Sequence, residues 1–406
     1  MQKDHGYNPP PVWTLMGYFI SNLHDASLGF MQFLGLIDEL FIVGMFAGIW
    51  WAFGWRVFSV SAILWGCQAT APNFWTMGAF LRQDWLFWFV MSACFTRKRY
   101  FKLAGASMVY SALLRVFPGL AVIAWLIVAG AYVVRHKRMR RDHLQTLIGG
   151  TLAAVVLVGA SLLVVGKNSY QDFYKHTIEV HDKTPLTNHV GLRVMLGHRT
   201  ECMFPDGFPP PIGNRETPPR NRDGQAAFMK NVYFGDCSSR LSGRMQYTQD
   251  PELPGTDPFE SWKEKRNARA HYYRWVGYAI IAFTLGLSAL IVGRIRSLWV
   301  AQALGQIWIV LLSQLTSYYY AFIIITGPLT RLRRDLEPKL FGFAAISQVV
   351  YIAFYFNDDK YTLLTYLTLG FCYYLLWSFA PKIWTKRLMF WKKDEPVAVE
   401  APPRKA

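Results

Sequence analysis

Two arginines and an aspartate interrupt otherwise apolar segments and are the residues best suited to chemistry. Arg82 and Asp84 lie in MGAFLRQDWLFWF, and Arg115 interrupts SALLRVFPG just before Pro118. Ionisable side chains in apolar runs cost about 2.5 to 3.5 kcal/mol each on insertion scales, so they are candidates for function. Because a guanidinium presents a rigid donor fork that matches phosphate, the arginines predict a groove for an anionic lipid headgroup. The alternative is structural: Arg82 pairs with Asp84 or Asp38, and Arg115 extends to the interface.

Other polar residues could complete such a site. Tyr319 belongs to a run of three tyrosines in SQLTSYYYAF, whose ring faces suit sugar binding but are equally typical of an interfacial aromatic belt. His181 and His189 could orient a phosphate or sugar hydroxyls, or be ordinary interfacial histidines. His176 and His181 are poorly spaced for zinc on one helical face, so we expect no metal. Asp4 is the candidate catalytic base for an acceptor hydroxyl, although an acidic residue near a chain end is usually just solvated.

The composition places these residues in a membrane protein. Of the 406 residues, 52% are hydrophobic and only 17% are charged, against roughly 25% in soluble domains. The apolar residues form blocks, several of them near the roughly 20 residues that a perpendicular span needs. We therefore predict an all-α polytopic membrane protein with about 10–12 transmembrane or half-membrane helices and one large outer-side loop.

Basic residues orient the predicted spans. Basic clusters fill the short connections on one side, at residues 97–102, 135–141, 294–296 and 331–339. The short connections on the other side hold only Lys3, Arg82, Arg115 and Lys360. Because cytoplasmic loops collect Lys and Arg, the clusters and the C-terminus are predicted to be cytoplasmic, and residues 167–272 to lie outside. The net charge of +17 is thus explained by topology, and no nucleic-acid partner is expected.

The chain divides into five predicted parts. These are an outer strap with an interfacial amphipathic helix (1–32), an N-terminal transmembrane bundle (33–166), the large outer loop (167–272), a C-terminal transmembrane bundle (273–382) and a basic tail (383–406). Cys202 and Cys237 are the two cysteines of the outer loop, and they either form a disulfide or stay free thiols. The alternation of sides places residues 1–11 outside, which predicts an apolar span upstream of Met1 unless a short tail crosses unaided.

Four segments share their residue types and order with one enzyme family. They are GYNPPPVW, NFWTMGAFLRQDWLFW, the run at 104–119 that ends in SALLRVFPG, and TSYYYAF. In these segments the chain resembles the polytopic glycosyltransferases of the GT-C fold, especially bacterial members that use polyprenyl-phosphate sugars. The resemblance implies a bacterial inner-membrane enzyme that transfers a sugar, with inversion, from a lipid-phosphate donor to an acceptor on the outer face. The family's acidic base lies in its first outer loop, which is largely absent here, so only Asp4 and Asp25 match it, and a base upstream of Met1 is the alternative.

Two other classes of protein share many of these features. A transporter or lipid flippase should have pseudo-symmetric halves with charges near the midplane, whereas the charges here are predicted near the outer surface. A noncatalytic membrane protein could use the large outer loop to dock a partner. The expected ligands of the leading hypothesis are membrane lipid and a polyprenyl-phosphate sugar, without a cofactor. A lateral groove that opens at the outer leaflet would separate the first hypothesis from the others.

Overall fold

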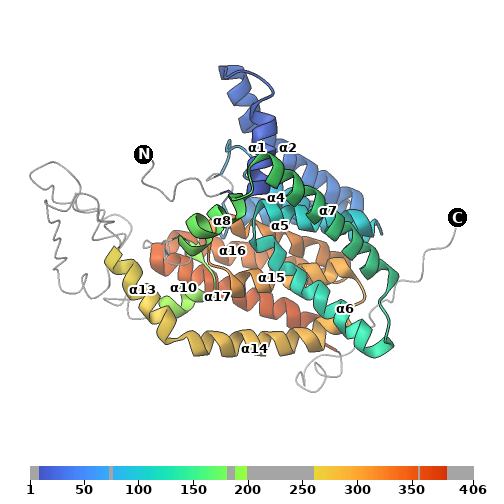
Figure 1. Ribbon diagram of the computed structural model, residues 1–406. Helices are drawn as coiled ribbons and strands as arrows, with labels where there is room; N and C mark the ends of the chain where they lie inside the picture. The colour runs from blue at the N-terminus through green and yellow to red at the C-terminus, as the bar shows by residue number, and fades with distance from the viewer. Residues whose placement is uncertain (1–8, 73–75, 181–187, 199–259, 355–356, 382–406) are drawn as a thin grey trace, which may run out of the picture.

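The computed structural model describes residues 9–72, 76–180, 188–198, 260–354 and 357–381. Within these ranges the chain is almost entirely helical, and the sheet structure is limited to two short paired strands (Figure 1). The prediction of an all-α polytopic membrane protein is confirmed.

The N-terminal part is a bundle of helices. It comprises α1 (Pro11–Ser21), α2 (Leu28–Phe53), α3 (Trp55–Cys67), α4 (Asp84–Arg97), α5 (Phe101–Leu114), the 3-10 helix η2 (Phe117–Ala121), α6 (Val122–His136) and α7 (Arg141–Val164). Helix α1 starts at Pro11, where the fixed φ of proline suits the first helical position. Ser27 caps α2 by accepting the backbone N–H of Phe30 at 3.2 Å. Gly54, with φ of +91°, separates α2 from α3.

The rest of the described chain packs below and beside this bundle. It comprises α8 (Ser169–Phe173), the π-helical turn η3 (Tyr174–Ile178), α10 (Leu192–Gly197), α13 (Glu260–Tyr272), α14 (Arg274–Ile291), η5 (Val292–Arg294), α15 (Leu298–Leu312), the 3-10 helices η6 (Ser317–Arg331) and η7 (Arg334–Leu336), α16 (Glu337–Ala353) and α17 (Asn357–Ser378). Strands β1 (His189–Val190) and β2 (Leu315–Thr316) pair antiparallel. Helix α15 lies at the centre and is buried from Leu298 to Leu311.

Four helical segments are long and apolar enough to cross a membrane. They are Leu28–Phe53, Phe117–His136, Arg141–Val164 and Arg274–Arg294. Their outward faces carry large apolar side chains, of which Leu163 on α7 is 88% exposed. Contiguous apolar surface of this kind needs lipid as its solvent, so the chain is an integral membrane protein.

Helices α5 and α7 cross in very close contact. A Cβ atom added at Gly105 would lie 1.9 Å from the carbonyl oxygen of Thr146, and one at Gly149 would lie 2.0 Å from that of Lys102. Small residues that let helix backbones meet in this way are typical of packing within membranes. This contact fixes α5, and therefore Arg115 at its C-terminal end.

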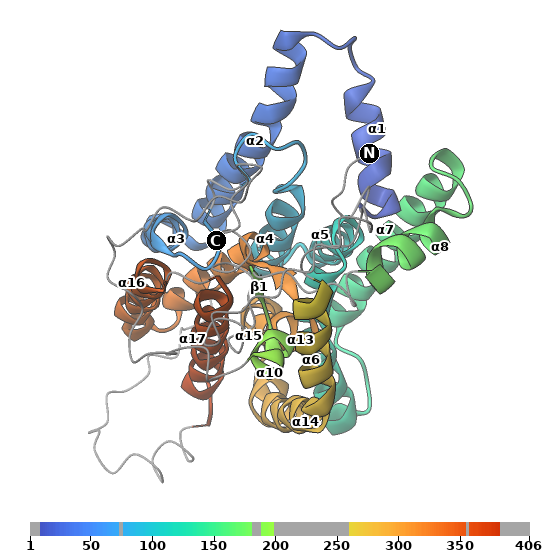
Figure 2. The same cartoon turned by 90° about the vertical axis from the view of Figure 1, so that its left-hand side faces the viewer.

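Polar contacts tie α10 and the residue after it to α17 and α13. His198, which follows α10, places Nε2 3.4 Å from Oδ1 of Asp359 in α17. Burial lowers the pKa of the His198 imidazole to about 4. Arg266 of α13 donates through Nη2 to the carbonyl oxygen of Val194 at 3.1 Å. Figure 2 shows α10 and α13 side by side, while α1 and the first turns of α2 rise away from the bundle.

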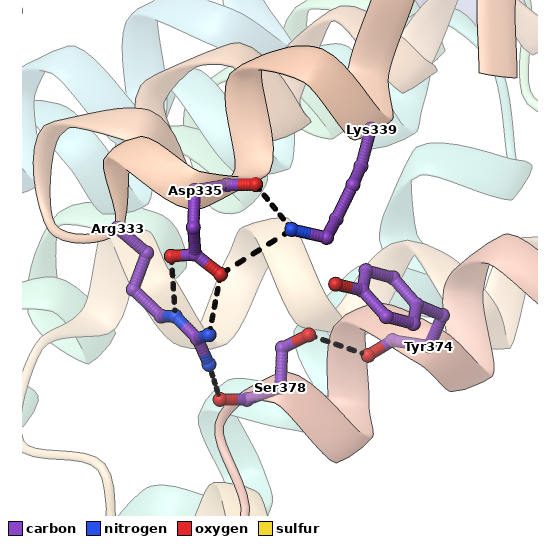
Figure 3. A network of polar contacts seen from close by, with 5 residues as sticks. All are labelled: Arg333, Asp335, Lys339, Tyr374 and Ser378. Atoms are coloured by element: carbon purple, nitrogen blue, oxygen red, sulfur yellow. Dashed lines mark hydrogen bonds and ion pairs between the residues drawn. The ribbon is translucent and has the colours of Figure 1, made fainter. Parts of the chain in front are cut away.

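A charged network joins η7 and the start of α16 to the C-terminal end of α17 (Figure 3). Arg333 donates to Asp335 through Nε at 3.0 Å and through Nη2 at 2.6 Å, and its Nη1 donates to the carbonyl oxygen of Ser378. Lys339 Nζ donates to the backbone oxygen of Asp335 at 2.5 Å. Hydrogen bonding to Arg333 holds the pKa of Asp335 below its ordinary value. The network fixes the connection between η6 and α16 against the end of α17.

Candidate functional site

Arg82 and Arg115 converge with aromatic rings from distant parts of the chain. The Arg82 guanidinium carbon lies 4.8 Å from the ring centre of Tyr318 and 5.9 Å from that of Tyr319. The Arg115 guanidinium carbon lies 5.7 Å from the ring centre of Trp13. The charges of both arginines act on the Tyr319 hydroxyl. Segments that begin near residues 13, 82, 115 and 318 therefore meet at one place.

We call this place the arginine cluster. It consists of Trp13, Asp38, Arg82, Asp84, Trp85, Arg115, Tyr318 and Tyr319. Of the residues that the sequence predicts for the site, the structure brings Arg82, Arg115, Asp84 and Tyr319 together.

Asp38 holds the backbone that carries Arg82. Its carboxylate accepts the backbone N–H of Arg82 at 2.9 and 2.8 Å and that of Gln83 at 3.1 Å. The side chain is only 1% exposed, so these hydrogen bonds offset the cost of burying its charge. Among the described residues, neither Arg82 nor Arg115 forms an ion pair with a carboxylate. The structural alternative of an Arg82–Asp38 ion pair is thus replaced by a backbone contact that leaves the guanidinium free to bind.

The residue before Arg82 adopts an unusual conformation. Leu81 has φ of +49°, in the left-handed region that is uncommon for a residue other than glycine. The indole Nε1 of Trp13 donates to the Leu81 carbonyl oxygen at 2.7 Å, which helps to hold this turn. Strained backbone that neighbouring contacts enforce is commonly found at functional sites.

Asp84 is a buried carboxylate with one oxygen free. It is 2% exposed, and Oδ1 accepts the backbone N–H of Trp85 at 2.7 Å. Oδ2 has no hydrogen-bond partner among the described residues. The charges of Arg115 and Asp38 both act on this carboxyl group. One oxygen of Asp84 therefore fixes the side chain in place, while the other is a buried acceptor without a hydrogen-bond partner among the described residues.

Further buried polar atoms of the same region lack partners. Within the described chain these are Nε of Arg82, Oε1 of Gln83, Nε1 of Trp85 and Nε of Arg115, in addition to Oδ2 of Asp84. Buried polar atoms are nearly always hydrogen-bonded, so a concentration of exceptions indicates a place for a polar ligand or for water. These unpartnered atoms are three donors, the nitrogens, and two acceptors, the oxygens of Gln83 and Asp84.

An aromatic wall bounds the cluster. Ring centroids are 4.8 Å apart for Trp85 and Phe117, 5.0 Å for Phe117 and Tyr319, and 4.5 Å for Tyr318 and Tyr319. Such edge and tilted contacts rigidify a wall that is apolar on its faces. The tyrosine run thus contributes to the cluster through two of its rings.

The short sheet positions the tyrosines. His189 pairs with Thr316, and Gln314 Nε2 lies 2.9 Å from His189 Nδ1. Tyr320 donates its hydroxyl to the Val190 carbonyl oxygen at 2.8 Å. The structure places His189 in β1, which pairs with β2, the strand that closely precedes Tyr318 and Tyr319 in the chain.

A cavity of about 870 Å³ lies beside α1. It is lined by the strap before α1, by Thr14, and by residues of the α7 to η3 segment that include Lys167, Phe173 and His176. Trp13 contacts Arg115 while the next residue, Thr14, lines the cavity. His176 therefore lies with this cavity, in a different place from His189.

Four predicted site residues, Asp4, His181, Cys202 and Cys237, lie outside the described residues. Sequence reasoning missed Trp13 and Trp85, because aromatic residues in apolar segments give no signal that separates a site from a core. It also missed Asp38 as the residue that positions Arg82.

Comparisons with protein-family models, with curated proteins and with solved structures find no match for this chain. The geometry of the arginine cluster is therefore the basis for assigning a function.

Proposed function

We propose that this chain is an integral-membrane glycosyltransferase whose arginine cluster binds a polyprenyl-phosphate sugar donor. The observation that carries the proposal is the convergence of Arg82 and Arg115, each against an aromatic ring and each with an unpartnered Nε. Two fixed guanidinium groups that have no carboxylate partner among the described residues suit the oxygens of a phosphate.

The remaining groups suit the sugar. Tyr318 and Tyr319 offer ring faces beside the arginines, and the apolar face of a pyranose packs well on such rings. The free Oδ2 of Asp84 accepts a sugar hydroxyl, and Nε1 of Trp85 donates to a sugar oxygen. These hydrogen bonds would satisfy buried atoms that otherwise carry a desolvation cost.

The proposed reaction is a displacement at the anomeric carbon. The acceptor hydroxyl oxygen forms the new bond to that carbon, the bond to the donor phosphate oxygen breaks, and polyprenyl phosphate leaves. The arginines stabilise the charge that develops on the leaving phosphate. A base takes the acceptor proton, and Asp4 is the sequence-derived candidate for this role.

The test uses purified protein in lipid nanodiscs with radiolabelled polyprenyl-phosphate hexose and pentose donors. We expect binding, followed by transfer or slow hydrolysis that releases labelled sugar. Asp84→Asn and Arg82→Lys should each reduce donor binding by about 10- to 100-fold, the value of one hydrogen bond to a charged group. Arg56→Lys is the matched control, because Arg56 is exposed, pairs with Glu337 at 2.7 Å and does not belong to the arginine cluster.

The outcomes separate the proposed function from its rivals. Donor binding without turnover, together with lipid movement across the bilayer, would instead assign a flippase. Failure of every donor to bind would leave no catalytic role for the cluster and would overturn the proposal.

A further inference from the structure

The turn between α4 and α5 concentrates positive charge, and it lies at the opposite end of these two helices from Arg82 and Arg115. Its basic residues are Arg97, Lys98, Arg99 and Lys102. Lys98, Arg99 and Lys102 are exposed, and none of the four forms an ion pair with a carboxylate in the described part of the chain. We call these four residues, together with the aromatic residues Trp51 and Tyr100, the basic turn.

Another basic connection shows how different this turn is. Around residues 331–339, Arg333 and Lys339 are both paired with Asp335 (Figure 3), and Arg56 pairs with Glu337. Acidic residues thus neutralise part of that connection from within. Among the residues that the structure describes, the basic turn has no such partner, so its charge is available to a ligand.

Aromatic rings place the basic turn at a particular depth. Trp51 of α2 stacks on Tyr100 with ring centroids 6.1 Å apart and an interplanar angle of 10°. Lys98 Nζ lies 5.1 Å from the ring centre of Trp51. Both rings are about half exposed, at 45% and 52%. Trp and Tyr concentrate at the headgroup level of membranes, so the cations around them lie at the depth of lipid phosphates.

We propose that the basic turn binds the phosphate headgroup of an anionic lipid in the cytoplasmic leaflet. The positive charge matches the headgroup, and the exposed ring pair matches the boundary between headgroups and acyl chains. A soluble anion would be attracted by the charges but would not contact the half-exposed rings, whereas a lipid would interact with both. This site is independent of the donor site and stands whether or not the chain is a transferase.

The experiment counts retained lipids. Wild-type protein is reconstituted in nanodiscs that contain equal parts of phosphatidylglycerol and phosphatidylcholine. The protein is then released from the nanodiscs, and the lipids that remain bound to it are identified by native mass spectrometry. The test variant is Lys98→Gln/Arg99→Gln/Lys102→Gln. The matched control, Arg296→Gln/Arg331→Gln/Arg334→Gln, removes the same charge from exposed residues of other basic connections. Thermal unfolding verifies that both variants are folded, and single Lys98→Gln replaces the triple variant if that one fails to fold.

Wild type should retain phosphatidylglycerol preferentially, and binding should fall by about fivefold for each charge removed from the basic turn. The control variant should retain the preference. Trp51→Leu should weaken it by a few-fold without any change in charge. Equal losses in the test and control variants would overturn the proposal, because the preference would then be a property of net charge. Displacement of the lipid by millimolar inorganic phosphate, or no preference in wild type, would overturn it as well.

Discussion

Arg115→Lys tests the arginine cluster most directly, because it keeps the charge and removes the fork. Arg115 is only 9% exposed, and Nη1 donates to the Leu114 carbonyl oxygen at 3.0 Å. This bond and the Trp13 ring fix the plane of the guanidinium, so its remaining N–H groups have a defined direction. A lysine at this position would present a mobile ammonium group in its place.

The expected loss can be worked from these contacts. If Arg115 binds the donor phosphate with two N–H groups, lysine loses one charge-assisted hydrogen bond of about 1.5 to 3 kcal/mol. Donor binding should then weaken by about 10- to 100-fold. The fold should change little, since lysine can still place a cation over the Trp13 ring, and we expect a stability loss below about 1 kcal/mol.

The assay is equilibrium binding of a labelled polyprenyl-phosphate sugar to wild type and Arg115→Lys at matched thermal stability. Arg56→Lys, which alters an exposed ion pair, should bind the donor like wild type. Equal donor affinities for wild type and Arg115→Lys would refute the assignment, because a side chain that only extends to the interface tolerates lysine.

Three further predictions concern stability. Asp38→Asn should lower the unfolding free energy by about 1 to 3 kcal/mol, because one amide N–H at residue 82 or 83 loses its buried acceptor; an unchanged melting temperature in detergent would contradict this. Gly105→Ala should destabilise by at least about 1 to 3 kcal/mol, since its Cβ would overlap a backbone oxygen, while Gly159→Ala, with open space around it, should melt like wild type. Asp335 has a lowered pKa, so its contribution is present above its ordinary value of 3.8 and is lost as the pH falls through the lower folded value. Stability should therefore drop by less than about 1 kcal/mol in that acidic range, and Asp335→Asn should abolish this part of the pH dependence in acid unfolding curves.

The fold class and the ends of several helices follow from local patterns in the sequence. The apolar run predicted to start at residue 33 starts at Leu28, because Ser27 caps the helix one turn earlier. Pro118 predicts a break, and the chain indeed leaves α5 before it and continues as the 3-10 helix η2. The 3-10 helix η6 could not be predicted from the sequence, because 3-10 runs of this length are uncommon. Its close contact at Gly327 with Ser61 of α3 is a tertiary contact, which local sequence patterns do not reveal.

The site illustrates the same division between local and tertiary information. The types of Arg82, Asp84 and Arg115 predicted a polar cluster near one surface, because buried charge is rare without function. Which groups pair could not be predicted: the structural alternative drawn from the sequence paired Arg82 with either Asp84 or Asp38. Asp38 instead accepts backbone amides, a contact that depends on how α2 lies against the turn at Leu81. A carboxylate satisfied by the backbone holds an arginine in place without consuming its side chain, which is the arrangement that a binding arginine needs.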